Sequence, residues 1–397
     1  MGTREPDNVL VINCGSSSLK FAVIEPTSGQ VLVQGLAERL NTEEGRLQVK
    51  PAEGERTTDA IPRMSHAKAL EAILKRLQSF KISAVGHRVV HGGEYFSGSV
   101  QLDEEAVRKI AACEVLAPLH NPANIVGIRA AMTSFPELPH VAVFDTAFHQ
   151  TMPPHAYLYA LRYELYEKHQ VRRYGFHGTS HRYVSGKAAE MLGKPVDSLQ
   201  MITSHLGNGC SACAVKEGKS VDTTMGLTPL EGLVMGTRSG DVDPNLLLFL
   251  VENTGRDFRD VTDLLNRGSG LLGISGLSND MRTLQEAADK GDRRADLAIA
   301  IFCYRLAKGI MALAASLDRL DAVVFTGGIG ENSAPVRERT LASLKVLKAE
   351  VSPELNAVHG KHAAGRITTE TSGLLAMVVP TNEELVIARE AIAFVHG

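Results

Sequence analysis

Residues 9–24 read as a strand, a short turn of glycine and serine, and a second strand, with flanks rich in Val, Ile and Phe. The small side chains of residues 15–18 leave backbone N–H groups and hydroxyls available to an anion. Lys20 adds a positive charge beyond the turn, and Asn13 before it offers a neutral oxygen suited to Mg²⁺. An ordinary serine-rich hairpin has the same pattern, so this segment alone does not indicate anion binding. The repetition of the pattern elsewhere in the chain favours it.

The strand–turn–strand device recurs at residues 201–215, M-I-T-S-H-L-G-N-G-C-S-A-C-A-V. Residues 321–332 have a related arrangement with a different sequence, in which an apolar strand is followed by the glycine turn T-G-G-I-G-E-N. Three such turns suggest backbone loops that converge on one polyphosphate. No G-x-x-x-x-G-K-[ST] loop occurs in the chain, and T-G-G-I-G-E-N does not match the dinucleotide pattern G-x-G-x-x-G.

Length and charge limit the class of protein. A chain of 397 residues with 44% hydrophobic residues predicts two globular domains. A formal charge of -3 without a basic block argues against a nucleic-acid partner. The first residues, M-G-T-R-E-P-D-N, contain no apolar signal region, and Pro6 does not fit a myristoylation pattern.

The longest apolar stretch, residues 297–317, contains Arg305 and Lys308, so we expect a buried helix and no membrane partner. The five scattered cysteines predict no disulfide framework and favour a cytoplasmic protein. Cys210 and Cys213 form a C-x-x-C pair, but a zinc site needs a second pair and a redox pair normally opens a helix. We expect these two cysteines to serve packing only.

Secondary-structure patterns alternate in the same way in both halves of the chain. The first half predicts a hairpin at 8–35, polar strands at 36–63, a helix from Ser65 to Phe80 and helices within 103–134. A buried strand at 140–146 places a carboxylate at its end, where open α/β sheets bind ligands. The second half predicts a hairpin at 201–220, a helix at 292–317, a strand at 322–326 and a last helix at 385–396. This pattern predicts a duplicated α/β unit with its cleft between the halves.

Several charged residues stand beside glycine or histidine in loops. Each has an ordinary explanation, because a loop arginine is usually solvated and a histidine beside glycine is usually hydrogen-bonded in a turn. His177 and His181 form H-x-x-x-H, but Gly178 stands where a zinc protease needs glutamate.

A set of motifs runs in order along nearly the whole chain: V-L-V-I-N-C-G-S-S-S-L-K, G-H-R-V-V-H-G-G, A-P-L-H-N-P, F-D-T-A-F-H, Y-G-F-H-G-T-S-H, H-L-G-N-G, M-G-T-R-S-G-D, F-T-G-G-I-G-E-N and P-T-N-E-E-L. In their sequence and their order, these motifs resemble those of the acetate kinase family. The resemblance implies two duplicated α/β domains of the actin/Hsp70-like (ribonuclease H-like) fold with an interdomain cleft. The expected domains are residues 1–150 with 385–397, and residues 151–384 for nucleotide binding and dimerisation. It also implies a homodimer that uses acetate, ATP and Mg²⁺, with Mn²⁺ as a possible substitute.

The resemblance further implies the roles of individual residues. The family's magnesium positions fall on Asn13 and Glu383. Its catalytic positions fall on Asp145, His177 and Arg238. Its acetate positions fall on Arg88, Val90, Leu119, His120, Phe176 and Pro229. Its ATP positions fall on Ser16, Ser18, Lys20, His205, Leu206, Gly207, Asn208, Gly209, Asp280, Met281, Arg282, Gly328, Ile329, Gly330, Glu331 and Asn332.

Two features of the expected site stay open. Cys14 stands where the family commonly has alanine, which could make activity sensitive to thiol reagents. Acetate is already ionised at neutral pH, so Asp145 has no proton to remove, and we favour a role in holding Mg²⁺ or its water.

The expected reaction has two rivals. Propionate or butyrate would need only a deeper pocket, since one methylene changes binding by about 1 to 3 kcal/mol. A non-catalytic ATP switch of the actin or Hsp70 kind shares the loops but needs no acyl-binding residues around Arg88.

Overall fold

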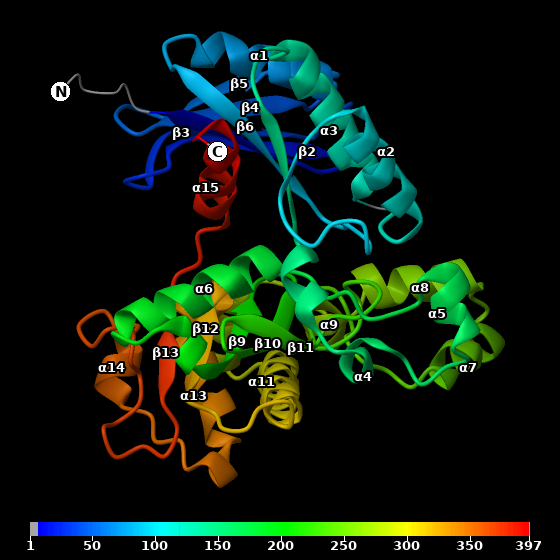
Figure 1. Ribbon diagram of the computed structural model, residues 1–397. Coiled ribbons are helices and arrows are strands. Elements are labelled where there is room, and N and C mark those ends of the chain that lie inside the picture. Colours follow the sequence, from blue (N-terminus) through cyan, green and yellow to red (C-terminus); the bar gives the residue numbers. More distant parts are fainter. Residues whose placement is uncertain (1–6, 119, 397) are drawn as a thin grey trace. The chain divides into compact units, whose positions relative to one another are not determined.

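The computed structural model describes residues 7–118 and 120–396 (Figure 1). The chain forms two compact units. The first contains the described residues up to Phe148 and the segment from Asn382, and the second is His149–Thr381.

The first unit is built on a sheet with the strand order β5-β4-β3-β2-β1-β6-β8-β7. The neighbours β1, β6 and β8 run parallel, whereas the strands from β5 to β1 pair antiparallel. The strands are β1 (Asn8–Cys14), β2 (Ser18–Glu25), β3 (Gln30–Glu38), β4 (Arg46–Pro51), β5 (Thr57–Ala60), β6 (Ile82–Val89), β7 (Val100–Gln101) and β8 (His140–Phe144).

Helices cover both faces of this sheet. Leu10 and Ile12 of β1 share an apolar core with Ile73 of α1, and Cys14 touches Gly127 of α3 on the same face. The opposite face carries α15, where a Cβ on Gly86 would lie 2.6 Å from Ile387 Cγ2. Glycine at position 86 is therefore what lets α15 approach β6. The helices of this unit are α1 (His66–Leu77), α2 (Glu104–Ala112), η1 (Cys113–Val115), α3 (Asn121–Ser134) and α15 (Glu383–His396), and the chain leaves the unit within η2 (Ala147–Thr151).

The second unit repeats the central pattern of the first in the order β11-β10-β9-β12-β13. Here β9, β10 and β11 pair antiparallel, as β1, β2 and β3 do in the first unit. The strands β9, β12 and β13 run parallel, as β1, β6 and β8 do in the first unit. The duplicated α/β fold is thus confirmed. The strands are β9 (Gln200–Leu206), β10 (Cys210–Lys216), β11 (Lys219–Thr223), β12 (Ala322–Thr326) and β13 (Ala376–Val378).

In Figure 1 the helices α6 and α11 lie on opposite faces of this second sheet. By length and composition α11 could cross a membrane, but its residues Ile299, Phe302 and Leu306 are buried, as in many core helices. The helices are α4 (Pro154–Tyr157), α5 (Glu164–His169), α6 (Gly178–Met191), η3 (Val196–Ser198), α7 (Asn245–Thr254), α8 (Phe258–Arg267), α9 (Gly270–Ser275), α10 (Met281–Asp289), α11 (Arg293–Ala314), α12 (Gly327–Asn332), α13 (Ala334–Ala342), η4 (Lys345–Leu347) and α14 (Pro353–Ala357).

One local prediction was wrong. The glycine turn expected after β12 is the short helix α12. Glycine disfavours helix, but the Glu331 side chain accepts the Gly327 N–H at 2.9 Å and the Thr381 N–H at 3.0 Å. These bonds hold the segment in its helical turn.

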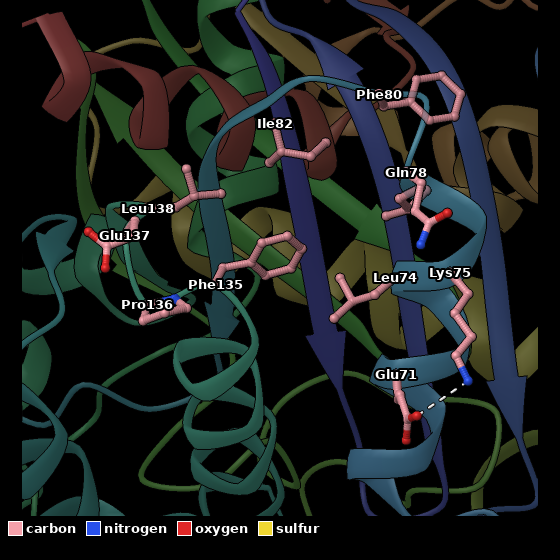
Figure 2. A pocket seen from close by; sticks show the side chains of 11 residues that line it. Glu71, Leu74, Lys75, Gln78, Phe80, Ile82, Phe135, Pro136, Glu137 and Leu138 are labelled. Carbon is pink, nitrogen blue, oxygen red and sulfur yellow. Dashed lines mark ion pairs between the residues drawn. The ribbon is translucent and has the colours of Figure 1, made fainter.

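An apolar pocket of about 540 Å³ lies in the first unit between α1 and the loop before β8 (Figure 2). Its lining includes Leu74, Ile82 and Phe135, and its ion pair is Glu71 with Lys75 at 3.3 Å. Ile82 begins β6, so the pocket opens at the amino-terminal edge of the parallel strands. It contains none of the residues expected to bind acetate or ATP.

Candidate active site

The expected site residues of the first unit gather at the carboxyl-terminal edge of its parallel strands. Asn13 lies near the end of β1 and Arg88 near the end of β6, and the register places Ile12 opposite His87. Asp145 directly follows β8, and its N–H donates to Val89 O at 3.0 Å. Since these strands are parallel, their carboxyl ends bring the three side chains to one edge.

Arg88 and Asp145 form a forked ion pair. Arg88 Nε donates to Asp145 Oδ1 at 3.0 Å, and Nη2 donates to Oδ2 at 2.7 Å. Asp145 is buried, whereas a quarter of the Arg88 side chain is exposed. The charge of Asp145 raises the pKa of Arg88, and Glu383 adds to this effect. Of the five N–H groups of Arg88, both on Nη1 and one on Nη2 meet no partner among the described residues.

The turn at residues 15–18, which we expect to bind phosphate, is supported by two side chains that sequence reasoning did not single out, His66 and Asn124. Gly15 N donates to Ser18 O at 2.8 Å, which closes the turn. His66 Nε2 lies 2.8 Å from Gly15 O, and Asn124 Nδ2 donates to Cys14 O at 2.7 Å. These two contacts use the carbonyl groups of Gly15 and Cys14. The side chains of Ser16 and Lys20 are exposed, so their hydroxyl and ammonium groups face solvent.

Asn124 also reaches the expected acetate pocket, because its Oδ1 accepts the Val90 N–H at 3.1 Å. One amide side chain thus links the last residue of β1 to the residue after β6. His120 precedes α3 and is half-buried. Leu119, also expected in this pocket, lies outside the described residues.

Glu383 is the first residue of α15, and its Oε1 is buried with no hydrogen-bond partner among the described residues. The neighbouring Glu384 is half-buried, and burial raises its pKa although Lys20 opposes the shift. In residues 7–118 and 120–396, no group of three or more His, Cys, Asp or Glu side chains is arranged to hold a metal ion.

In the second unit the expected site residues gather around the loop after β9. Gly207 N donates to Gly209 O at 3.0 Å. A Cβ on Gly209 would lie 3.4 Å from Arg238 Nη1 and 3.5 Å from His177 Nε2, so both nitrogens face the same point. Arg238 Nη1 also donates to Pro229 O at 3.3 Å. Burial lowers the pKa of Arg238 from its ordinary value.

His177 precedes α6 in a left-handed conformation with φ of 57°. Such a conformation is strained for a residue with a Cβ and is often found at functional sites. Its ring stacks on His205 with centroids 4.3 Å apart, and the neighbouring Phe176 is buried.

The three expected ATP segments of the second unit meet at the end of β9. Asn279 Nδ2 donates to Asn208 Oδ1 at 2.9 Å, which places the Asp280 segment beside the glycine loop. Asp280 caps α10 by accepting the Arg282 and Thr283 N–H groups. A Cβ on Gly327 would lie 2.8 Å from Leu206 O, so the start of α12 touches the same loop. The remaining residues expected to bind ATP lie within these segments.

Arg337 is a supporting residue that sequence reasoning missed. It is fully buried, and burial lowers its pKa to about 10. Its guanidinium donates to Gly330 O at 2.8 Å and Glu331 O at 3.1 Å in α12, and to Asn356 Oδ1 at 2.8 Å. A buried arginine on a helix has the same sequence signature as an exposed one, so no local signal identified it.

The cysteines behave as packing residues. The structure describes all five, and all are buried and unpaired. Burial raises the pKa of Cys14, Cys210 and Cys213 to about 12. This argues against the thiol sensitivity raised by Cys14, because the thiolate is the reactive form.

Comparison with known proteins identifies the family. The model of the acetokinase family matches residues 8–389. This chain belongs to the acetokinase family. It is 54% identical over 392 residues to acetate kinase of Deinococcus radiodurans, covering 98% of both chains. It is 53% identical over 397 residues to acetate kinase of Shewanella baltica, again covering 98% of each.

Solved structures of this family have the same fold. A propionate kinase from Francisella tularensis superposes with a TM-score of 0.92 at 48% identity, covering 98% of this chain and 99% of the other. Acetate kinase of Porphyromonas gingivalis superposes with a TM-score of 0.92 at 44% identity, covering 98% of this chain and all of the other.

Proposed function

We propose that this acetokinase transfers the γ-phosphoryl group of ATP to acetate, giving acetyl phosphate and ADP. The observation that carries the proposal is the Arg88–Asp145 pair. Asp145 takes the Nε and Nη2 hydrogens on one side of the guanidinium, which leaves the Nη1 edge for a second carboxylate. A planar guanidinium binds a carboxylate through two parallel hydrogen bonds, so this edge suits acetate.

The reaction is difficult because a carboxylate must approach a polyanion. At an effective dielectric near 20, each unit repulsion at about 4 Å costs roughly 4 kcal/mol. Arg88 compensates the charge of acetate, while Arg238 and His177 donate to the transferring phosphoryl group beside Gly209. Phosphoryl transfer needs positioning and charge stabilisation more than covalent help.

The segments around the end of β9 bind ATP in this proposal. The H-L-G-N-G loop, the start of α10 and the start of α12 offer backbone N–H groups and small side chains close together. Ser16, Ser18 and Lys20 of the first unit contribute to phosphate binding. Mn²⁺ is the substitute for Mg²⁺ that the family resemblance implies.

Asn13 and Glu383 would hold Mg²⁺. The fit is supported by the buried Glu383 Oε1, a carboxylate oxygen without a hydrogen-bond partner among the described residues. Mg²⁺ binds through one or two protein oxygens and keeps several waters, so two residues suffice. When bound, the ion would neutralise charge on the phosphates.

Propionate is the second candidate substrate, because a propionate kinase from Francisella tularensis is 48% identical to this chain. Val90, Leu119, Phe176 and Pro229 would line the acyl pocket and so decide the preferred chain length. Of the two carboxylates, we propose acetate as the preferred substrate.

The enzyme would act as a homodimer in the cytoplasm. Exposed apolar side chains in the second unit suit a subunit interface: Leu161, Tyr163, Leu248, Phe249 and Phe258. Five unpaired cysteines suit a reducing compartment. Light scattering of the purified protein measures the subunit number.

Hydroxylamine trapping of acyl phosphate tests the function. Purified protein with ATP and Mg²⁺ is assayed with acetate, propionate and butyrate, with and without EDTA. We expect acyl phosphate with acetate and none with EDTA. ATP turnover that needs no acyl substrate and yields no acyl phosphate would refute the proposal.

A further inference from the structure

A chain of buried hydrogen bonds leads to His177 from the core of the second unit. Thr203 Oγ1 lies 2.7 Å from His181 Nδ1, and His181 Nε2 lies 2.8 Å from Ser211 Oγ. Ser211 Oγ in turn lies 2.8 Å from His177 Nδ1. Thr203, His181 and Ser211 are fully buried.

The fold explains this alignment. His177 and His181 are four residues apart at the start of α6, so they share one face of the helix. Thr203 and His205 lie on one face of β9, and Ser211 pairs with His205 across the hairpin. The helix and this face of the hairpin therefore meet through hydroxyl and imidazole groups.

The direction of the hydrogen bonds follows from counting hydrogens. A hydroxyl has one hydrogen, and a neutral imidazole has one N–H and one acceptor nitrogen. His181 is neutral, because burial and the nearby His149 and His205 lower its pKa well below the ordinary value.

In the outward arrangement, Thr203 donates to His181 Nδ1, His181 Nε2–H donates to Ser211, and Ser211 donates to His177 Nδ1. Both hydroxyl hydrogens are then used. In the reverse arrangement the Thr203 hydrogen has no acceptor among the described residues. If both imidazoles donate to Ser211, the serine hydrogen has none. A buried hydroxyl without a partner costs about 1 to 3 kcal/mol, so the outward arrangement is favoured.

We infer that Thr203, His181 and Ser211 are positioning residues that fix the tautomer of His177, so that its proton sits on Nε2. That nitrogen faces the point beside Gly209 that Arg238 Nη1 also faces. It therefore presents a donor, not a lone pair, to an anionic oxygen there. The inference rests on the proposed function only for the catalytic meaning of this proton.

This chain of hydrogen bonds from Thr203 through His181 and Ser211, here called the relay, also makes a positive charge on His177 unnecessary. The titratable and charged groups near His177 include His205, stacked on its ring, His181 on the same helix, and Arg238 beside Gly209. The permanent positive charge of Arg238 disfavours a second positive charge on His177. A neutral ring with a fixed Nε2–H supplies the donor without that cost.

The test compares Thr203→Val, which removes the first donor while keeping the shape, with Thr203→Ser, which restores the hydroxyl. Ser204→Ala is the matched control, because Ser204 is a buried β9 residue whose Oγ meets no hydrogen-bond partner among the described residues. Ser211→Ala is a further variant that acts directly on His177.

The first measurement needs no substrate. Long-range proton–nitrogen NMR of protein with isotope-labelled histidine, assigned with His177→Gln, reports which ring nitrogen carries the proton. We expect Nε2–H in wild type, Thr203→Ser and Ser204→Ala, and a mixture of tautomers in Thr203→Val. Nδ1–H on His177 in wild type, or an unchanged tautomer in both Thr203→Val and Ser211→Ala, would overturn the inference.

The second measurement is steady-state kinetics. Thr203→Val should lower kcat about 10-fold or more with little change in either KM, and Thr203→Ser should restore kcat. Equal kcat in Thr203→Val and Ser204→Ala would also overturn the inference. If the tautomers are as expected but no acetyl phosphate forms, the relay stands and the proposed function fails.

Discussion

Arg88 and Asp145 are 57 residues apart in the chain, yet they meet side-on through two hydrogen bonds of 3.0 and 2.7 Å. Arg88 lies in β6, and Asp145 directly follows β8, the adjacent parallel strand. Because both oxygens of Asp145 accept from Arg88, the carboxylate orients the guanidinium. We therefore favour Asp145 as the residue that positions Arg88, while its expected role toward Mg²⁺ stays a prediction.

Asp145→Asn separates these two roles. Losing the charge should loosen Arg88, raise KM for acetate and lower kcat, and Arg88→Ala should do the same. The double variant should be far less than additive, since residues in direct contact couple by about 0.5 to 3 kcal/mol. Steady-state kinetics over a range of Mg²⁺ provides the measurement. Rescue of Asp145→Asn by high Mg²⁺ with an unchanged acetate KM would favour the magnesium role.

Val90→Ala should shift the preference toward propionate. Val90 is half-buried directly after β6, and removing two methyl groups opens room for a longer acyl chain. We expect the propionate-to-acetate ratio of kcat/KM to rise about 10-fold. Val126→Ala on α3 is the control, because Val126 is 47% exposed. An unchanged ratio in Val90→Ala would place the size filter elsewhere.

Arg337→Met should destabilise the second unit and weaken ATP binding. It leaves the buried carbonyls of Gly330 and Asn356 without their donor, which should cost at least about 3 kcal/mol. Arg339→Met on the same helix removes an exposed pair with Asp296 and should cost at most about 1 kcal/mol. Urea unfolding and KM for ATP are the measurements. Similar losses in the two variants would show that Arg337 does not support α12.

The buried pair His87 and His140 should make the first unit sensitive to acid. His87 Nε2 lies 3.0 Å from His140 Nδ1, and burial lowers the pKa of His87 to about 3 and also lowers that of His140. Between the ordinary value near 6.5 and about 3, the unfolded chain binds protons that the folded chain does not. The free energy of unfolding should therefore fall as pH falls, by up to about 1.4 kcal/mol per unit for each group.

His87→Gln keeps a donor toward His140 but cannot titrate in this range. Urea unfolding at about pH 7, 6 and 5 should show a shallower loss of stability than wild type. His362→Gln, at an exposed position, is the control and should keep the wild-type slope. Equal slopes in all three proteins would exclude the pair as the source of acid sensitivity.

Local sequence patterns predicted most of the elements that carry the site. The hairpins around Gly15 and Gly207, the helix after Ser65 and the strands that end near Arg88 and Asp145 were all expected. They were predictable because apolar periodicity, caps and turn residues act within a few positions. The glycine-rich start of α12 was missed, since its helix depends on Glu331 and Arg337 and not on its own propensity.

The sequence by itself determined a duplicated α/β fold and, through its ordered motifs, the acetokinase family. Only the tertiary structure decided how side chains support one another: Asp145 holds Arg88, Asn124 joins Cys14 to Val90, and Ser211 stands between His177 and His181. The partners in the first two relationships lie far apart in the chain, and His177 and His181 are joined through a serine on another strand. A hydrogen bond depends on distances of a few ångströms that no residue type or spacing encodes. It is the packing of helices on the two sheets that sets those distances.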